Sequence, residues 1–125
     1  MYTPPCADIQ QEVAVDVVHI LRAWSEHHAE FVVGANEAGM KLGSDIRAAD
    51  AAVWRRAAVG PATGRLRHTP PVLAVEIAGR DDYEPALTEK AGWYLGHGVD
   101  VVWIVLPETG EVVVLQPGEH ACFER

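Results

Sequence analysis

Apolar side chains near the start of the chain recur at every third or fourth position. This is the period of one face of an α-helix. Asp8, followed by Gln11 three residues later, resembles the capping box with which helices begin. We therefore predict an amphipathic helix over residues 8–28. The members of its apolar stripe are Ile9, Val13, Val17, Ile20, Leu21 and Trp24.

Two strand patterns follow this helix. Residues 31–33 are a short strand candidate, and the glycine and asparagine residues after it suit a turn or bulge. Residues 46–55 are rich in Ala and Val, and a loop by composition follows at residues 60–64. If residues 46–55 form a strand, alternation places these side chains on one face: Ile46, Ala48, Asp50, Ala52 and Trp54.

Buried strands and a second helix complete the pattern. Residues 72–78 are almost continuously apolar, which is typical of a central strand covered on both faces. A helix is expected from about residue 84, with Pro85 in its first turn and Gly96 or Gly98 at its end.

Two further strands, at residues 101–106 and 111–116, are separated by a hairpin-like Pro-Glu-Thr-Gly connection. A helix between two buried strands suggests a right-handed crossover. We therefore expect one α/β domain over residues 1–125, with a mixed sheet flanked by helices in the rough order α-β-β-β-α-β-β.

The formal charge of −8 is unevenly distributed. Residues 1–40 hold six acids and one base, residues 41–80 hold seven bases and three acids, and residues 81–125 hold nine acids and two bases. The acidic total disfavours wrapping of nucleic acid and adhesion to anionic membranes. The basic middle third limits where DNA could dock, and its candidate phosphate contacts are Arg47, Arg55, Arg56, Arg65 and Arg67.

Several classes of protein are disfavoured by missing patterns. The sequence has no apolar run of about 18 residues and no apparent signal peptide, so we expect no membrane span and a cytoplasmic location. It also lacks a GxGxxG or Walker loop and a GxSxG elbow, which disfavours nucleotide-binding and serine hydrolase functions.

Two carboxylates interrupt the apolar strands. Asp50 and Glu76 each sit in the middle of such a run, with small alanines on either side. Burying a lone carboxylate costs several kcal/mol or raises its pKa until it is neutral. A divalent cation removes that cost, and Mg²⁺ favours one or two carboxylates with several waters; Mn²⁺ is the alternative ion. The other interpretation is that each acid lies at a strand end or pairs with a nearby arginine.

Lys90 is the third residue of interest. It lies beside the apolar stripe of the second predicted helix, from which its ammonium can extend toward the strand ends. Two carboxylates, a metal and a lysine form a set suited to cleaving phosphodiesters. Alternatively, Lys90 is an ordinary exposed helix lysine.

Four segments in this order resemble the Uma-type family of bacterial proteins, which has the restriction-endonuclease-like PD-(D/E)XK fold. They are residues 47–53, 70–77, 90–95 and 98–105, and the resemblance is strongest over residues 45–115. It implies Mg²⁺-dependent cleavage of nucleic acid. By the same resemblance, Asp50 and Glu76 match the metal-binding acids and Lys90 the lysine on the following helix.

The sequence departs from this family in three places. Ala49 replaces a proline before the aspartate, and residues 78–80 differ from the usual Ser-Pro-Ser. Relatives also begin with a strand hairpin that carries a further acid, whereas this sequence reaches its first helix at about residue 8. We interpret the chain as an N-terminally shortened member.

Three hypotheses follow. The first is a Mg²⁺-dependent nuclease with Asp50, Glu76 and Lys90 as its catalytic residues. The second is a catalytically degenerate member of the same fold that serves as a binding or assembly module. The third, compatible with both, is a homodimer in which residues 111–116 form an exposed edge strand that pairs with a second copy.

Overall fold

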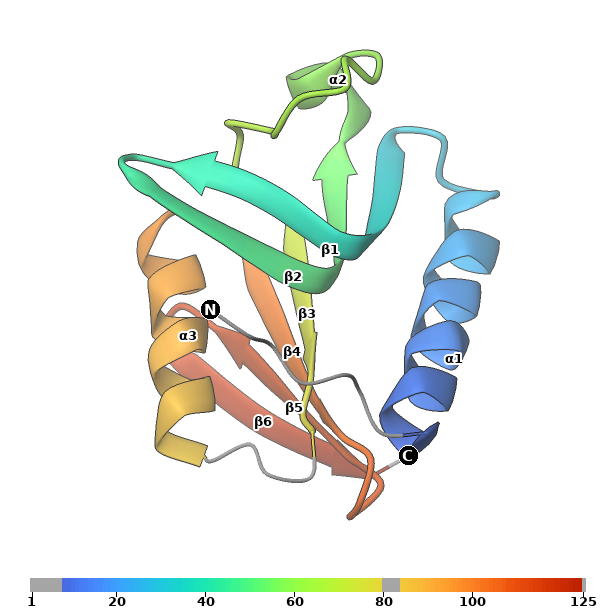
Figure 1. Ribbon diagram of the computed structural model, residues 1–125, viewed down its shortest axis with the longest axis vertical. Helices are drawn as coiled ribbons and strands as arrows, with labels where there is room; N and C mark the ends of the chain where they lie inside the picture. Colours follow the sequence, from blue (N-terminus) through green and yellow to red (C-terminus); the bar gives the residue numbers. More distant parts are fainter. Residues whose placement is uncertain (1–7, 80–83, 125) are drawn as a thin grey trace.

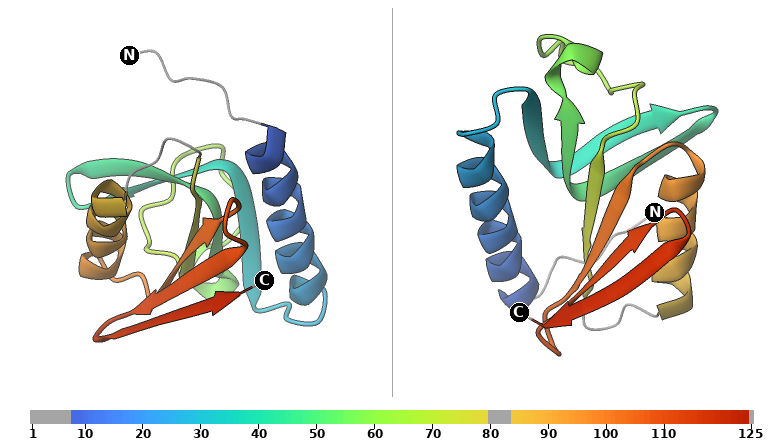
Figure 2. Two further views of the ribbon diagram at one scale, coloured as in Figure 1. Left: turned by 90° about the horizontal axis from the view of Figure 1, so that it is seen from below. Right: turned by 180° about the vertical axis from the view of Figure 1, so that it is seen from behind.

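Six strands form a single twisted sheet in the order β1-β2-β3-β4-β5-β6, with one long helix on each side (Figures 1 and 2). The computed structural model describes residues 8–79 and 84–124. The elements are α1 (Asp8–Ser25), β1 (Phe31–Leu42), β2 (Asp45–Arg55), α2 (Arg56–Val59), β3 (Leu73–Ile77), α3 (Glu84–Gly96), β4 (Val101–Leu106), β5 (Glu111–Gln116) and β6 (Glu119–Glu124).

The sheet is mixed, as the sequence predicted. Strands β3 and β4 run parallel and are connected through α3, whereas all other neighbours run antiparallel. The predicted order lacked only β6 and the single turn α2. Residues 111–116 were expected at an edge, and this is wrong because β6 pairs with β5 along its whole length.

Each face of the sheet packs against its own helix. On one face, α1 contributes Val13, Val17 and Leu21 to a cluster with side chains of β2 and β3. On the other face, Ala91 and Tyr94 of α3 pack against residues of β1 to β4. All five residues of β3 are buried, which confirms the prediction of a central strand covered on both sides.

Helix α1 uses only part of its predicted apolar stripe and ends at Ser25 instead of residue 28. Ile9, Ile20 and Trp24 are 43%, 59% and 39% exposed, respectively. Helix α1 lies over β1 to β3, so Ile20 does not reach the sheet fully and lines an apolar depression of about 610 Å³ beside β4 and β5. None of the helices among the described residues has the length and apolar character needed to cross a membrane.

A bulge in β1 determines the shape of the first half of the sheet. The short strand predicted at residues 31–33 extends to Leu42 because the expected bulge interrupts the strand without ending it. Ala35 pairs with Ala51 and Ala38 with Ala49, so two residues of β1 lie opposite Asp50 alone. These two residues, Asn36 and Glu37, have left-handed φ values of 61° and 57°.

The bulge also overturns the predicted face of β2. Ala49 and Ala52 both join the cluster on the α3 side, although strict alternation would place them on opposite faces. Ile46 is 61% exposed and does not share the buried face of Ala52 and Trp54. The strand therefore changes face at Asp50, because the bulge adds local twist there.

Replacing Glu37 with glycine should stabilise the protein. A left-handed conformation costs a residue with a Cβ about 1–2 kcal/mol, and glycine avoids this cost. Roughly half of the gain is cancelled because glycine has more conformational freedom to lose on folding. We expect Glu37→Gly to raise the free energy of unfolding by about 0.5–1 kcal/mol in urea titrations. Glu37→Ala keeps the Cβ and should bring no such gain, so equal effects of the two substitutions would contradict this origin of the strain.

Candidate functional site

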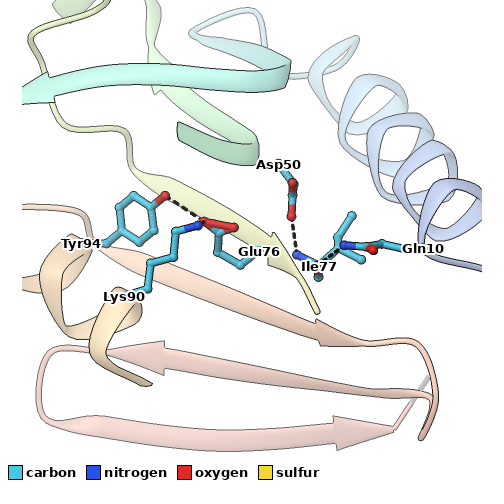
Figure 3. A network of polar contacts seen from close by, with 6 residues as sticks. All are labelled: Gln10, Asp50, Glu76, Ile77, Lys90 and Tyr94. Carbon is cyan, nitrogen blue, oxygen red and sulfur yellow. Dashed lines mark hydrogen bonds and ion pairs between the residues drawn. The ribbon is translucent and has the colours of Figure 1, made fainter. Parts of the chain in front are cut away.

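Strand β2 separates from β3 at Asp50. Their ladder pairs Val53 with Leu73 and Ala51 with Val75, so the next pair would be Asp50 with Glu76, but the pairing ends first. Beyond this point the Asp50 side chain bonds to β3 in place of the main chain of β2. Its Oδ2 accepts a hydrogen bond of 2.7 Å from the backbone N–H of Ile77 (Figure 3). A carboxylate thus replaces the main-chain acceptor that β2 would have supplied.

Glu76 is the adjacent residue of β3 and points toward α3. Its Oε1 lies 2.7 Å from Nζ of Lys90 and accepts a hydrogen bond of 2.9 Å from the Tyr94 hydroxyl (Figure 3). Lys90 and Tyr94 are four residues apart on α3 and therefore share one face of that helix. The Glu76 side chain is charged and yet only 6% exposed.

Opposing effects act on the ionisation of Glu76. Burial raises the pKa of its carboxyl above the ordinary value, and the negative charge of Asp50 acts in the same direction. The Lys90 ammonium and the Tyr94 hydroxyl lower that pKa by stabilising the carboxylate, but burial has the larger effect. Burial and the charge of Glu76 also raise the pKa of Tyr94, so its hydroxyl remains a donor at neutral pH.

The structure therefore brings together the three residues singled out in the sequence. Asp50 and Lys90 both act electrostatically on Glu76, and Asp50 also acts on Tyr94. The alternative interpretation, in which each acid pairs with a nearby arginine, is wrong for Glu76, because Glu76 pairs with Lys90. Ala74 and Ala78, two positions either side of Glu76, are buried and small, as expected.

Sequence reasoning missed two residues of this network. Tyr94 was assigned only to the apolar stripe of the second helix, although its hydroxyl binds Glu76. Gln10 of α1 donates a hydrogen bond of 2.9 Å from Nε2 to the carbonyl of Ile77 (Figure 3). The spacing of Lys90 and Tyr94 could have indicated the first, whereas nothing in the sequence relates Gln10 to a residue 67 positions away.

The candidate phosphate contacts do not form one continuous strip. Arg47 lies beside the site, where it packs 5.0 Å from the centre of the Trp93 ring of α3 and pairs with Glu89 at 3.7 Å. Arg55 ends β2 and Arg56 begins α2, where the Arg56 guanidinium donates to the backbone carbonyls of Ala29 and Phe31.

Two more of these arginines follow α2. Arg67 packs on Trp54, at 5.1 Å from the ring centre, and Arg65 is exposed in the loop. The last base of the middle third, Arg80, lies outside the described residues. Of the five candidates, Arg47 alone is anchored next to α3.

Two carboxylates are the acidic ligands that this centre offers. Within residues 8–79 and 84–124, no group of three or more His, Cys, Asp or Glu side chains could hold a metal ion. Asp50 and Glu76 come from neighbouring strands, and a cation would offset the cost of the buried charge on Glu76. Such a set fits Mg²⁺ or Mn²⁺, which complete their coordination with water and substrate oxygens.

Comparisons with known proteins place these observations in context. The family model Uma2, described as "Putative restriction endonuclease", matches residues 1–124. A crystal structure of a "putative nuclease belonging to DUF820" from Anabaena variabilis ATCC 29413 superimposes with a TM-score of 0.86 at 16% identity, over 100% of this chain and 72% of that one. This likeness confirms the predicted fold class. A search of curated proteins found no match.

The raised pKa of Glu76 should make stability depend on pH. Between the ordinary value of 4.5 and the higher folded value, the folded state retains a proton that the unfolded state has lost, so stability falls as pH rises through this window. Glu76→Gln cannot lose that proton. We therefore expect the free energy of unfolding of the wild type, minus that of Glu76→Gln, to decrease as pH increases above 4.5.

Urea unfolding of both proteins at closely spaced pH values measures this difference. Glu30→Gln is the matched control, because Glu30 is an exposed acid paired with His28 away from the site. A difference that increases with pH would show that the Lys90 ammonium outweighs burial.

Proposed function

The chain belongs to the Uma2 family of putative restriction endonucleases, whose model spans residues 1–124, and on this premise we propose that it is a Mg²⁺-dependent nuclease. The observation that carries the proposal is the contact between the buried Glu76 carboxylate and Lys90 Nζ at 2.7 Å, beside an Asp50 that is tied to the next peptide. A buried acid, a second acid and an ammonium group are the components that phosphodiester cleavage requires.

Asp50 and Glu76 are the residues that would hold the ion, with Mn²⁺ as the alternative to Mg²⁺. When bound, the ion lowers the pKa of a water molecule and neutralises negative charge on the phosphate. The hydrogen bond from Ile77 orients the Asp50 carboxylate, and the one from Tyr94 orients Glu76. Both acids are therefore preorganised before substrate arrives.

Lys90 would act directly on the reacting groups. Its Nζ lies 2.7 Å from Glu76 Oε1, and its side chain is 33% exposed, which leaves it partly accessible to a substrate. There it stabilises the charge that develops on the phosphate oxygens and orients the attacking water. The same ammonium favours the ionised form of Glu76, which is the form that binds a cation.

The proposed substrate is DNA, held through a small number of phosphates. Arg47 is the arginine nearest the centre, and Arg55, Arg56, Arg65 and Arg67 would contact the nucleic acid further along. Since the whole chain carries a formal charge of −8, binding should be weak and sensitive to salt. A cytoplasmic location remains part of this prediction.

The second candidate is a catalytically degenerate member that acts as a binding or assembly module. One observation favours it: the Lys90 ammonium already contacts the Glu76 carboxylate at 2.7 Å and offsets part of the cost of burying it, so the protein itself supplies a positive charge at this position. The two candidates differ in whether the protein binds a divalent cation.

Cleavage assays with site variants separate the two candidates. We expect the wild type to cleave single- or double-stranded DNA only with Mg²⁺ or Mn²⁺, and Asp50→Asn and Glu76→Gln to lose cleavage. Lys90→Met should lower kcat by about 10²–10³-fold, as does the loss of one donor that stabilises charge in the transition state. Glu30→Gln removes an exposed charge away from the centre and should retain activity.

Calorimetric titration of the same proteins with Mg²⁺ provides the second measurement. Binding tighter than millimolar by the wild type, lost in Glu76→Gln, supports the nuclease. Absence of both binding and cleavage in the wild type would favour the degenerate module, and equal cleavage by Glu76→Gln would refute the assigned site.

A further inference from the structure

Ile77 ends β3 at the point where β2 has already moved away. Alternate residues of a strand bond to opposite neighbours. Because the N–H of Ala78 donates to Val105 of β4, the polar groups of Ile77 face β2. In a continued ladder, Ala49 of β2 would lie opposite Ile77. The last residue of the strand thus has no main-chain partner in β2.

Two side chains replace that partner. Asp50 accepts the N–H of Ile77 at 2.7 Å, and Gln10 donates to its carbonyl at 2.9 Å (Figure 3). The N–H and the carbonyl of one residue belong to successive peptide planes, which rotate about φ and ψ. The two bonds together therefore fix both dihedral angles of Ile77 and keep β3 extended beyond its last pair with β2.

Gln10 is well placed for this task. It is half-buried in the first turns of α1, and three and seven residues later Val13 and Val17 anchor the helix in the core. These three side chains share the helix face that meets the sheet. The position of the amide is thereby fixed by packing on the side of the sheet opposite to Lys90 and Tyr94.

We propose that Gln10 is a positioning residue of the nuclease centre, an inference that rests on the proposed function. By holding the Ile77 carbonyl, it keeps the Ile77 N–H directed at Asp50 and the preceding residue, Glu76, directed at α3. Through the Ile77 backbone, Gln10 of α1 thus helps to orient both acids. Side chains that hold metal ligands in place typically contribute 10–100-fold to metal affinity or activity.

The test compares Gln10→Leu with Val17→Ala. Leucine has similar bulk but cannot donate, whereas Val17→Ala weakens the packing of the same helix and leaves the hydrogen bond intact. In the metal-free protein, we expect Gln10→Leu to reduce the exchange protection of the Ile77 amide about tenfold more than that of other β3 amides. Val17→Ala should lower protection across β3 evenly.

The second readout is the Mg²⁺ concentration for half-maximal cleavage by the full chain. Gln10→Leu should raise it about tenfold with little change in kcat at saturating Mg²⁺. Val17→Ala should leave it unchanged. An unchanged Mg²⁺ requirement in Gln10→Leu, or the same requirement in both variants, would overturn the positioning role.

The two readouts also separate this inference from the proposed function. A wild type without Mg²⁺-dependent cleavage overturns the nuclease, and the effect on Mg²⁺ affinity falls with it. Amide exchange at Ile77 still decides whether Gln10 holds the end of β3. Protection equal to wild type in Gln10→Leu would show that it does not, even if the enzyme proves active.

Discussion

The burial of one carboxylate, that of Glu76, constrains everything around it. A charge in the central strand of a sheet covered on both faces is tolerated only when it is compensated. Helix α3 therefore has to present Lys90 and Tyr94 on the face that packs against β3, and the connection from β3 to β4 has to pass over that side. The parallel pairing of β3 with β4 and the position of α3 together place Lys90 and Tyr94 next to Glu76.

The bulge in β1 is the second constraint. It sets two left-handed residues against Asp50, changes the face of β2 and coincides with the end of the β2–β3 ladder. Residues in such conformations persist only when the surrounding structure holds them. Here the consequence is that the end of β3 is no longer paired with β2, and side chains replace the main chain of β2 as hydrogen-bond partners. The local strain and the candidate site are parts of one arrangement.

The two sides of the sheet contribute differently to this centre. The α3 side supplies the ammonium and the hydroxyl that contact Glu76, and the α1 side supplies an amide that contacts only the backbone. A nuclease of this design would separate the groups that meet substrate from those that hold the strand in place. A catalytically degenerate protein would keep the same network for stability, because each buried polar side-chain atom of the network has a hydrogen-bond partner within the protein.

From the residue pattern alone, the two long helices and the central strands could be predicted, and Asp50, Glu76 and Lys90 could be singled out as candidates. Periodicity fixes which side chains can be buried, and a charge inside an apolar run is visible without coordinates. It could not determine the face of β2, because alternation assumes a regular strand and the bulge breaks it. It could not assign Gln10, whose partner is set by how α1 packs. Only the tertiary structure decides such contacts, since hydrogen bonds to backbone groups depend on proximity in space and leave no pattern in the residues between them.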